Sequence, residues 1–223
     1  VLSVDAEEET FSLFVKAVGG GTRALTGLAP GEVAQCLGPL GRPFTAPAAG
    51  TEAVMVAGGY GIAPFHLFAR ELGREGRAGR VFYGGRTADD LKLRDRFDGL
   101  LPLVAATEDG SLGRPGRVTA PLLQYLEERR GAVKLYACGP DAMLHAVAHL
   151  ATSRGLDAEV SLDPWMGCGI GTCLGCVVRV QRPEEARARY RCACTEGPVF
   201  DASVVVWPGE TASTARRRAG VEA

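Results

Sequence analysis

The sequence has no long hydrophobic run, no excess of either charge and few histidines. No apolar stretch approaches the ~20 residues that a membrane-spanning helix requires. The chain of 223 residues carries 25 Lys and Arg against 26 Asp and Glu, so its charge gives no reason to expect a nucleic-acid partner. Residues 1–10 are acidic and lack the basic segment that opens a signal peptide, so we expect a cytoplasmic protein.

Hydrolytic motifs are absent as well. The chain contains no G-x-S-x-G elbow and no Ser–His–Asp set. His145 and His149 are four residues apart on a predicted helix, a spacing that can bind a metal, but no Glu or third ligand lies near them in the sequence. We therefore interpret them as a pair on a helix surface.

Two changes of pattern divide the chain. Residues 1–47 read as the end of a β-rich module, in which 11–20 resembles a strand, 19–22 a tight loop, and 30–41 a strand and turn. After a Pro/Ala/Gly linker, residues 48–157 alternate apolar strands with amphipathic helices, which predicts a parallel sheet covered on both faces. The strands are expected at 53–59, at 81–86, within 101–110 and from 134, and the helices at 62–76, 91–100, 119–131 and up to 155.

The regular alternation ends near residue 158. Residues 158–207 are rich in loops, glycine and cysteine, with a short strand at 177–180 and a closing apolar segment at 199–207. Residues 208–223 have low hydrophobicity, which is typical of a flexible tail. The fold class expected from this order is α/β plus β, with a small C-terminal domain.

Glycines occupy the turn between the first buried strand and its helix. Gly58, Gly59 and Gly61 would let the backbone approach a phosphate at the helix N-terminus. The same pattern also occurs in plain tight connections, and it departs from strict G-x-G-x-x-G.

The ends of later strands strengthen the nucleotide interpretation. Arg86 follows the second strand, a polar turn at 107–113 follows the third, and Cys138, Gly139 and Pro140 follow the fourth. Because ligands of open α/β sheets bind at the carboxyl ends of the strands, these segments predict a cofactor crevice. Cys138 fits either that crevice or a role as a small buried hydrophobic residue.

Five of the seven cysteines crowd into the segment 168–194. Cys168, Cys173 and Cys176 have the C-x4-C-x2-C spacing of plant-type [2Fe–2S] proteins, which use a distant cysteine as fourth ligand. Gly167, Gly169, Gly171 and Gly175 leave room for backbone N–H groups to turn toward the sulfurs. The spacing and the glycines therefore predict a [2Fe–2S] cluster.

A disulfide scaffold and a structural zinc site are the alternatives to that cluster, and the identity of its fourth ligand is open. Disulfide scaffolds are usually shorter and space their cysteines more evenly, and structural zinc sites usually pair cysteines in two short knuckles. Cys192 and Cys194 compete for the fourth position, because an extended C-A-C would point them in opposite directions. Spacing does not decide between them.

The motifs together resemble a known family. CGIGTCLGCVVRV followed by YRCACTEGPVF closely resembles the electron-transfer subunits of class 1B dihydroorotate dehydrogenases. The likeness extends upstream through GGGTRALTGLAPGE, LGPLGRPF, GGYGIAP, GGRTADDL, TEDGSLG and ACGPDAML. It implies a ferredoxin-reductase-like architecture with a flavin-binding β-barrel, an NAD-binding α/β domain and a C-terminal [2Fe–2S] domain.

The resemblance also implies roles for single residues. The cysteine before x-x-G-P-V-F is the family's fourth ligand, which corresponds to Cys194 and leaves Cys192 as an extra thiol. The family's FAD contacts correspond to Ser3, to the strand segment Phe14, Val15 and Lys16, and to the pair Gly21 and Thr22. Val1 stands where the family has a proline, so a further FAD-binding arginine and most of the barrel would precede it.

The implied function is electron transfer. In this family, electrons pass from FMN on a dihydroorotate dehydrogenase catalytic subunit through [2Fe–2S] and FAD to NAD+, in a heterotetramer with two copies of each subunit. Trp165 and Met166, beside the cysteine loop, would then contact the partner or simply pack. The rival hypotheses are a reductase module of a hydrogenase or NADPH:ferredoxin system, and a zinc-stabilised module without redox activity.

Overall fold

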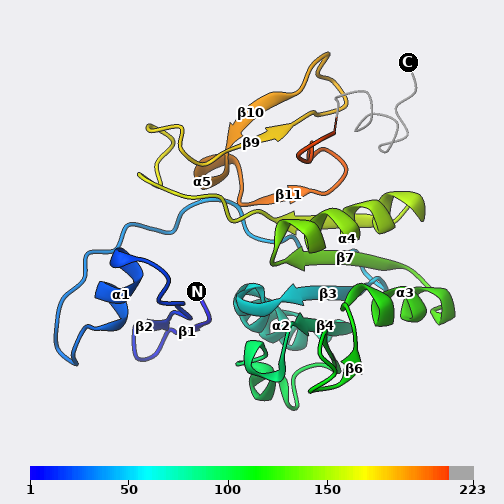
Figure 1. The fold of residues 1–223 in the computed structure, drawn as a ribbon, viewed down its shortest axis with the longest axis horizontal. Coiled ribbons are helices and arrows are strands. Elements are labelled where there is room, and N and C mark those ends of the chain that lie inside the picture. Colours follow the sequence, from blue (N-terminus) through cyan, green and yellow to red (C-terminus); the bar gives the residue numbers. More distant parts are fainter. Residues whose placement is uncertain (211–223) are drawn as a thin grey trace.

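A seven-stranded sheet runs through the computed structural model, which describes residues 1–210 (Figure 1). In spatial order its strands are β11 (Val199–Asp201), β8 (Asp157–Ser161), β7 (Val133–Cys138), β3 (Glu52–Gly58), β4 (Gly79–Gly85), β5 (Leu103–Thr107) and β6 (Arg114–Pro115). All neighbouring strands are parallel except β11, which runs antiparallel to β8. The predicted parallel sheet is therefore present, with an antiparallel strand added at one edge.

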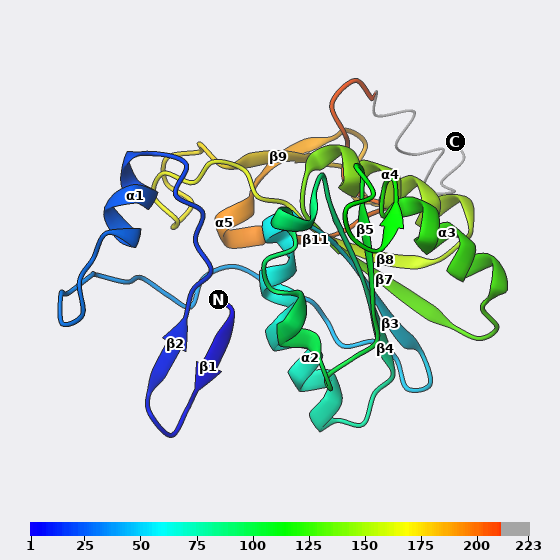
Figure 2. The same cartoon turned by 60° about the horizontal axis from the view of Figure 1, so that its bottom comes forward.

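Helices cover both faces of this sheet, as the alternation predicted (Figure 2). Helix α2 (Ala63–Arg74) packs on one face and buries side chains such as Phe65 and Leu72. Helices α3 (Thr119–Glu128) and α4 (Asp141–Ser153) pack on the other face. Neighbouring residues of β3 divide between the two faces, because successive side chains of a strand point in opposite directions. Among the described residues, no helix is long and apolar enough to cross a membrane.

Two expectations for this part of the chain are wrong. Residues 91–100 do not form a helix but contain only the 3-10 turn η3 (Arg94–Phe97), after a similar turn η2 (Ala88–Asp90). The Asp90 carboxylate accepts hydrogen bonds from the backbone of Arg86 and Thr87, and this bends the chain directly after β4. Strand β8 was missed, because its sequence DAEVS alternates polar and apolar residues instead of forming a fully apolar run.

The N-terminal segment contains less strand than its pattern predicts. Strands β1 (Ser3–Asp5) and β2 (Thr10–Ser12) form an antiparallel hairpin, and residues 13–18 and 30–41 are irregular. An alternating segment becomes a strand only when a neighbour supplies ladder hydrogen bonds, and none of the described residues pairs with 13–18. The GGGT motif, predicted as a tight loop, instead enters the short helix α1 (Gly20–Thr26).

The linker that follows this segment packs, at residues 44–45, on the seven-stranded sheet and on α2. The Phe44 ring packs against Phe65 and Phe68 of α2 and edge-on against Tyr136 of β7. The Tyr136 hydroxyl donates a hydrogen bond to the Thr45 carbonyl at 2.8 Å, and the backbone N–H of Thr45 donates to Glu159 of β8 at 2.9 Å. Residues 44–45 therefore hold the N-terminal segment against the sheet.

The cysteine-rich residues follow β8 and return to the sheet through β11. Strands β9 (Val177–Val180) and β10 (Arg189–Cys192) form a second hairpin, and the one-turn helix α5 (Ala193–Glu196) leads to β11. Phe200, Val205 and Trp207 are buried in the same hydrophobic core as Leu144 and Val147 of α4. Of the predicted flexible tail, residues 211–223 lie outside the described part of the chain, and the described residues 208–210 form a turn beside α4.

Candidate functional site

The sheet reverses its strand order between β3 and β7. The chain builds β4 and β5 on one side of β3 and then places β7 on the other side, with Ala57 paired to Cys138 at the carboxyl end. In open α/β sheets such a reversal leaves a crevice at the carboxyl ends of the two strands. The predicted glycine-rich segments that follow β3 and β7 therefore meet at the position where this class of fold binds dinucleotides.

These two segments touch backbone to backbone. A Cβ atom added to Gly61 would lie 2.1 Å from the carbonyl oxygen of Cys138, and one added to Gly58 would lie 2.6 Å from Cδ of Pro140. Gly139 has a φ of +150°, and a Cβ atom added to it would lie 2.8 Å from the nitrogen of Gly58. Gly58, Gly61 and Gly139 are thus required for the close approach of the two loops. Gly59, with a φ of +51°, is required for the turn itself.

Arg86 and Cys138 have different environments at this edge. Arg86 follows β4, its side chain is 81% exposed, and its Nε lies 3.9 Å from Oδ2 of Asp90, which makes it available to an anionic ligand. Burial raises the pKa of the Cys138 thiol to about 11, so this group stays neutral at physiological pH. Cys138 is consequently an unreactive buried residue.

Part of the predicted flavin segment lies against the same edge. The Phe14 ring stacks on Tyr60, with ring centroids 4.4 Å apart, and Nζ of Lys16 lies 5.2 Å from the centre of the Tyr60 ring. Nδ1 of His66 in α2 lies 2.9 Å from the carbonyl oxygen of Leu2, which ties the residue before β1 to this helix. Tyr60 was not predicted as a site residue, although its position between Gly59 and Gly61 was a signal for it.

The remaining predicted flavin residues lie elsewhere in the N-terminal segment. Ser3 pairs with Ser12 in the β1–β2 hairpin. The Thr22 hydroxyl accepts hydrogen bonds from the backbone of Val18 and Gly19, so it caps α1. Within residues 1–210, no hydrogen bond or ring contact joins Gly21 or Thr22 to Tyr60.

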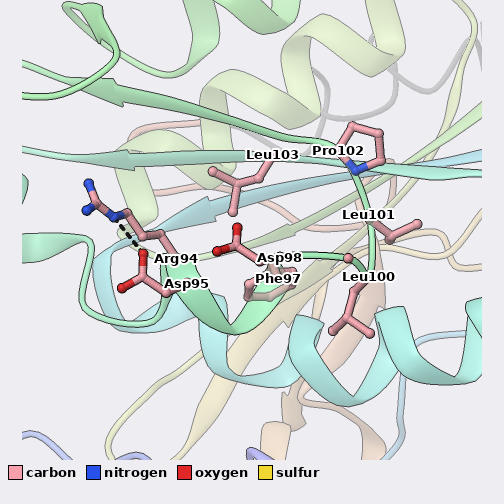
Figure 3. Close-up of a pocket in the computed structure, with 9 residues that line it drawn as sticks. Arg94, Asp95, Phe97, Asp98, Leu100, Leu101, Pro102 and Leu103 are labelled. Carbon is pink, nitrogen blue, oxygen red and sulfur yellow. Dashed lines mark hydrogen bonds and ion pairs between the residues drawn. The ribbon is translucent and has the colours of Figure 1, made fainter.

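A hollow of about 630 Å³ lies away from this edge (Figure 3). Its lining comes from η3 and the segment leading into β5, including Phe97, Leu101 and Leu103. The segment at 98–102 precedes β5, so the hollow is at the amino ends of the strands, where this class of fold does not bind nucleotides. We therefore assign no ligand to it.

The cysteine loop turns its backbone N–H groups toward sulfur, as the glycine content predicted. The N–H of Cys173 donates to Sγ of Cys168, and the N–H of Gly175 donates to Sγ of Cys173, each at 3.4 Å. Cβ atoms added at Gly167 and Gly175 would lie 3.3 and 3.6 Å from Sγ of Cys173. A side chain at position 167 would therefore crowd this sulfur, whereas one at 175 would make an ordinary van der Waals contact.

The other cysteines approach from β9, β10 and α5. The N–H of Ala193 donates to the carbonyl of Cys176, and Cys192 pairs with Val177. The chain turns from strand to helix at this point, so the expectation of an extended C-A-C is wrong. Cys176 and Cys194 are 2% and 3% exposed, whereas Cys192 is half-buried.

Electrostatics favour thiolates in part of this group. Hydrogen bonds from the backbone of Cys173 and Ile170 lower the pKa of Cys168 to about 6. The backbone N–H of Cys194 and then its thiol lower the pKa of Cys176, while the hydrogen bond to Cys176 and then burial raise the pKa of Cys194. Burial and the charge of Cys176 raise the pKa of Cys192. The charges of Cys176 and Cys168 act on both Cys192 and Cys194, so these thiols form one interacting group.

The spread of the sulfurs fits a two-iron cluster better than a single zinc ion. With Zn–S bonds of about 2.3 Å, four tetrahedral sulfurs lie about 3.8 Å from one another. Among the described residues, no three cysteine sulfurs lie within 4.8 Å of one another. In a [2Fe–2S] cluster two thiolates serve each iron, so a wider spacing of the four sulfurs is the expected arrangement.

Comparisons with known proteins agree with this geometry. Residues 163–206 match the iron-sulfur cluster binding domain of dihydroorotate dehydrogenase B, and residues 55–149 match an oxidoreductase NAD-binding domain. The electron transfer subunit of dihydroorotate dehydrogenase B (NAD(+)) from Desulforamulus reducens is 34% identical over 205 residues, which are 92% of this chain and 77% of that protein. The chain belongs to this family.

Other relatives support the same family and fold. The electron transfer subunit from Geobacillus thermodenitrificans is 36% identical, over 91% of this chain and 77% of that protein. A solved NADH-dependent reduced ferredoxin-NADP oxidoreductase, described for flavin-based electron bifurcation, superposes with a TM-score of 0.75 and 29% identity. It covers 93% of this chain and 71% of that chain. The ferredoxin-reductase-like fold expected from the sequence is confirmed.

The contact of the two glycine loops gives a direct test of the crevice. Gly61→Ala places a methyl group against the Cys138 carbonyl, so we expect a loss of about 1–3 kcal/mol in the free energy of unfolding, measured by urea denaturation. Gly73→Ala in α2 is the control: its Cβ meets no atom within 4 Å, and it should leave stability unchanged or raise it by up to about 1 kcal/mol. Equal stability of the two variants would contradict the described contact.

Proposed function

We propose that this chain carries electrons from the FMN of a dihydroorotate dehydrogenase catalytic subunit to NAD+, as its family does in pyrimidine biosynthesis. The carrying observation is the cysteine loop with backbone N–H groups turned toward its sulfurs, in a chain that aligns over nine-tenths of its length with these electron transfer subunits. The chain is an oxidoreductase subunit with [2Fe–2S], FAD and NAD as cofactors. When bound, the cluster passes single electrons and FAD exchanges either single electrons or a hydride, which lets it connect the cluster to NAD.

The four cluster ligands in this proposal are Cys168, Cys173, Cys176 and Cys194. Cys194 is favoured over Cys192 because it is buried with Cys176 in the same apolar core and stands at the family's ligand position before x-x-G-P-V-F. Cys192 lies at the end of β10, where its sulfur is 4.0 Å from the carbonyl of Gly171. We assign Cys192 no ligand role.

The nucleotide sites follow from the carboxyl edge of the sheet. Gly58, Gly59, Gly61, Gly139 and Pro140 would hold NAD, since their backbones form the wall between β3 and β7. Arg86 would contact an anionic part of the ligand and Cys138 would line the crevice. For FAD, the contact of Phe14 and Lys16 with Tyr60 supports the segment 14–16, whereas Ser3, Gly21 and Thr22 rest on the family resemblance.

The functional regions would be a flavin segment at 1–47, an NAD domain at 48–157 and a cluster domain at 158–207. Strand β8, which opens the last region, pairs with β7 of the NAD domain, so the cluster domain would be held rigidly against that domain. We place the protein in the cytoplasm, in a heterotetramer of two electron transfer subunits and two catalytic subunits.

The partner would dock on the cysteine loop. Trp165 is 94% exposed, and Met166, Ile170 and Leu174 in the same loop are 46%, 54% and 62% exposed. Cys168 and Cys173 lie on this outer part of the loop, whereas Cys176 and Cys194 face the core. An apolar rim around the less buried ligands suits a protein that must bring its own redox group near the cluster.

Reconstitution tests the function as a whole. Mixing the holoprotein with an FMN-containing dihydroorotate dehydrogenase subunit should yield NAD-linked oxidation of dihydroorotate, while the chain alone should have none. The solved ferredoxin-NADP oxidoreductase relative favours a second candidate, electron exchange with ferredoxin and NADP. Failure with dihydroorotate together with NADPH-dependent reduction of ferredoxin would support that candidate instead.

Substitutions of the two adjacent cysteines test the ligand assignment. Cys194→Ser should remove a buried ligand and abolish the native cluster, whereas Cys192→Ser should largely retain it. Iron and acid-labile sulfide analysis, with EPR of the dithionite-reduced protein, measures both. Loss of the cluster in Cys192→Ser and its retention in Cys194→Ser would overturn the assignment, and one zinc per chain with no EPR signal would overturn the cluster itself.

Truncation of the exposed tryptophan tests the docking surface. Trp165→Ala should weaken association with the catalytic subunit about tenfold, because buried tryptophans dominate many interfaces. Cluster content and NADH oxidation with ferricyanide should not change. Leu123→Ala, which replaces an exposed apolar residue on α3, should leave the Kd for the catalytic subunit unaltered. Equal affinity of the Trp165→Ala variant and the unaltered chain would place the interface elsewhere.

A further inference from the structure

His145 and His149 are not the isolated surface pair that the sequence predicted. The carboxylate of Glu210, 61 residues beyond His149 in the chain, lies between them. Its Oε1 atom is 3.2 Å from Nε2 of His145 and 3.2 Å from Nε2 of His149. The expectation that no Glu or third ligand is nearby is therefore wrong, because residues 207–210 return to α4 and bring Glu210 to the two histidines.

From this convergence we propose that His145, His149 and Glu210 form a binding site for a divalent transition-metal ion, with Zn²⁺ as the best-fitting class. Among the described residues this is the group of three possible ligand atoms that lie within 4.8 Å of one another. Imidazole nitrogen with one carboxylate oxygen is a donor set typical of zinc. The site is separate from the cysteine loop and from the nucleotide edge of the sheet.

The distances suit a tetrahedral ion. With Zn–N and Zn–O bonds of about 2.0–2.2 Å, neighbouring ligand atoms in a tetrahedral site are about 3.3–3.5 Å apart. The two Nε2–Oε1 distances of 3.2 Å are close to this value. Both imidazoles present Nε2 to the same oxygen, so small shifts would admit the ion, with water as a fourth ligand.

The carboxylate is held in place before any ion binds. The Glu210 side chain is only 8% exposed, its Oε2 accepts a hydrogen bond from the backbone of Trp207 at 3.2 Å, and its own N–H donates to the Trp207 carbonyl at 3.0 Å. Trp207 is buried against α4, and its ring centroid is 5.3 Å from that of His145. Such orientation of a ligand by its surroundings is what metal sites require.

The consequence would be a metal clamp between two parts of the molecule. Glu210 follows directly after the cluster region at 158–207. The end of that region is bonded to β9, since the N–H of Val206 donates to the carbonyl of Arg179. The histidines belong to α4 of the NAD sheet. The bound ion would therefore fasten the end of the cluster region to the helix that covers the NAD sheet.

Titration of the intact holoprotein with Zn²⁺ tests this site. Isothermal calorimetry should give one Zn²⁺ per chain with no loss of the cluster's visible absorbance. His149→Ala and Glu210→Gln should each weaken the Kd at least about tenfold, because even changes outside the ligand set cost 10–100-fold. The side chain of His149 is 51% exposed, so its variant should fold normally.

Two further observations make the test decisive. Glu127→Gln, an exposed carboxylate that pairs with Arg154, is the matched control and should leave the Kd unchanged. Zn²⁺ should raise the Tm of the unaltered protein but not that of the His149→Ala variant. The proposal is overturned if millimolar Zn²⁺ does not bind, if binding survives both ligand substitutions, or if uptake occurs only as cluster absorbance is lost.

Discussion

The burial of Cys176 and Cys194 in the core under α4 is the constraint on which the rest of the structure depends. Both residues belong to the same apolar cluster as Val160 of β8, Phe200 of β11 and Trp207. That cluster also contains the buried face of α4, so one core serves the cysteine region and the nucleotide-type sheet. The two thiols cannot move relative to the sheet without exposing this apolar surface.

Because of this shared core, one part of the cysteine loop is buried and the other part faces solvent. One pair of sulfurs is fixed from within, while Cys168 and Cys173 lie on a loop whose apolar neighbours face solvent. The linker adds a third attachment, since Phe44 and Thr45 bind the sheet and Leu40 lies against the loop near Gly169. The N-terminal segment, the cysteine loop and the parallel sheet are therefore joined through the contacts of Leu40, Phe44 and Thr45.

Much of this arrangement could be predicted from the sequence, where the signal was local. Apolar runs such as 53–59 identify buried parallel strands, and the C-x4-C-x2-C spacing together with its glycines indicates a [2Fe–2S] cluster. Residues whose role depends on distant partners could not be predicted. Strand β8 has a polar alternation and becomes a strand through its neighbours β7 and β11. Residues 13–18 have the pattern of a strand but no described neighbour to pair with. Tyr60 and Glu210 acquire their contacts only when segments far apart in the chain meet.

We propose that the cluster held by this loop lies on the electron route between the partner's substrate and NAD. Rapid-freeze EPR of the assembled complex, mixed with dihydroorotate in the absence of NAD+, tests this position of the cluster. The signal of a reduced [2Fe–2S] cluster should appear within the turnover time of the enzyme and should disappear when NAD+ is added. A cluster that stays oxidised while the same complex reduces NAD+ at its full rate would show that the electrons take another route.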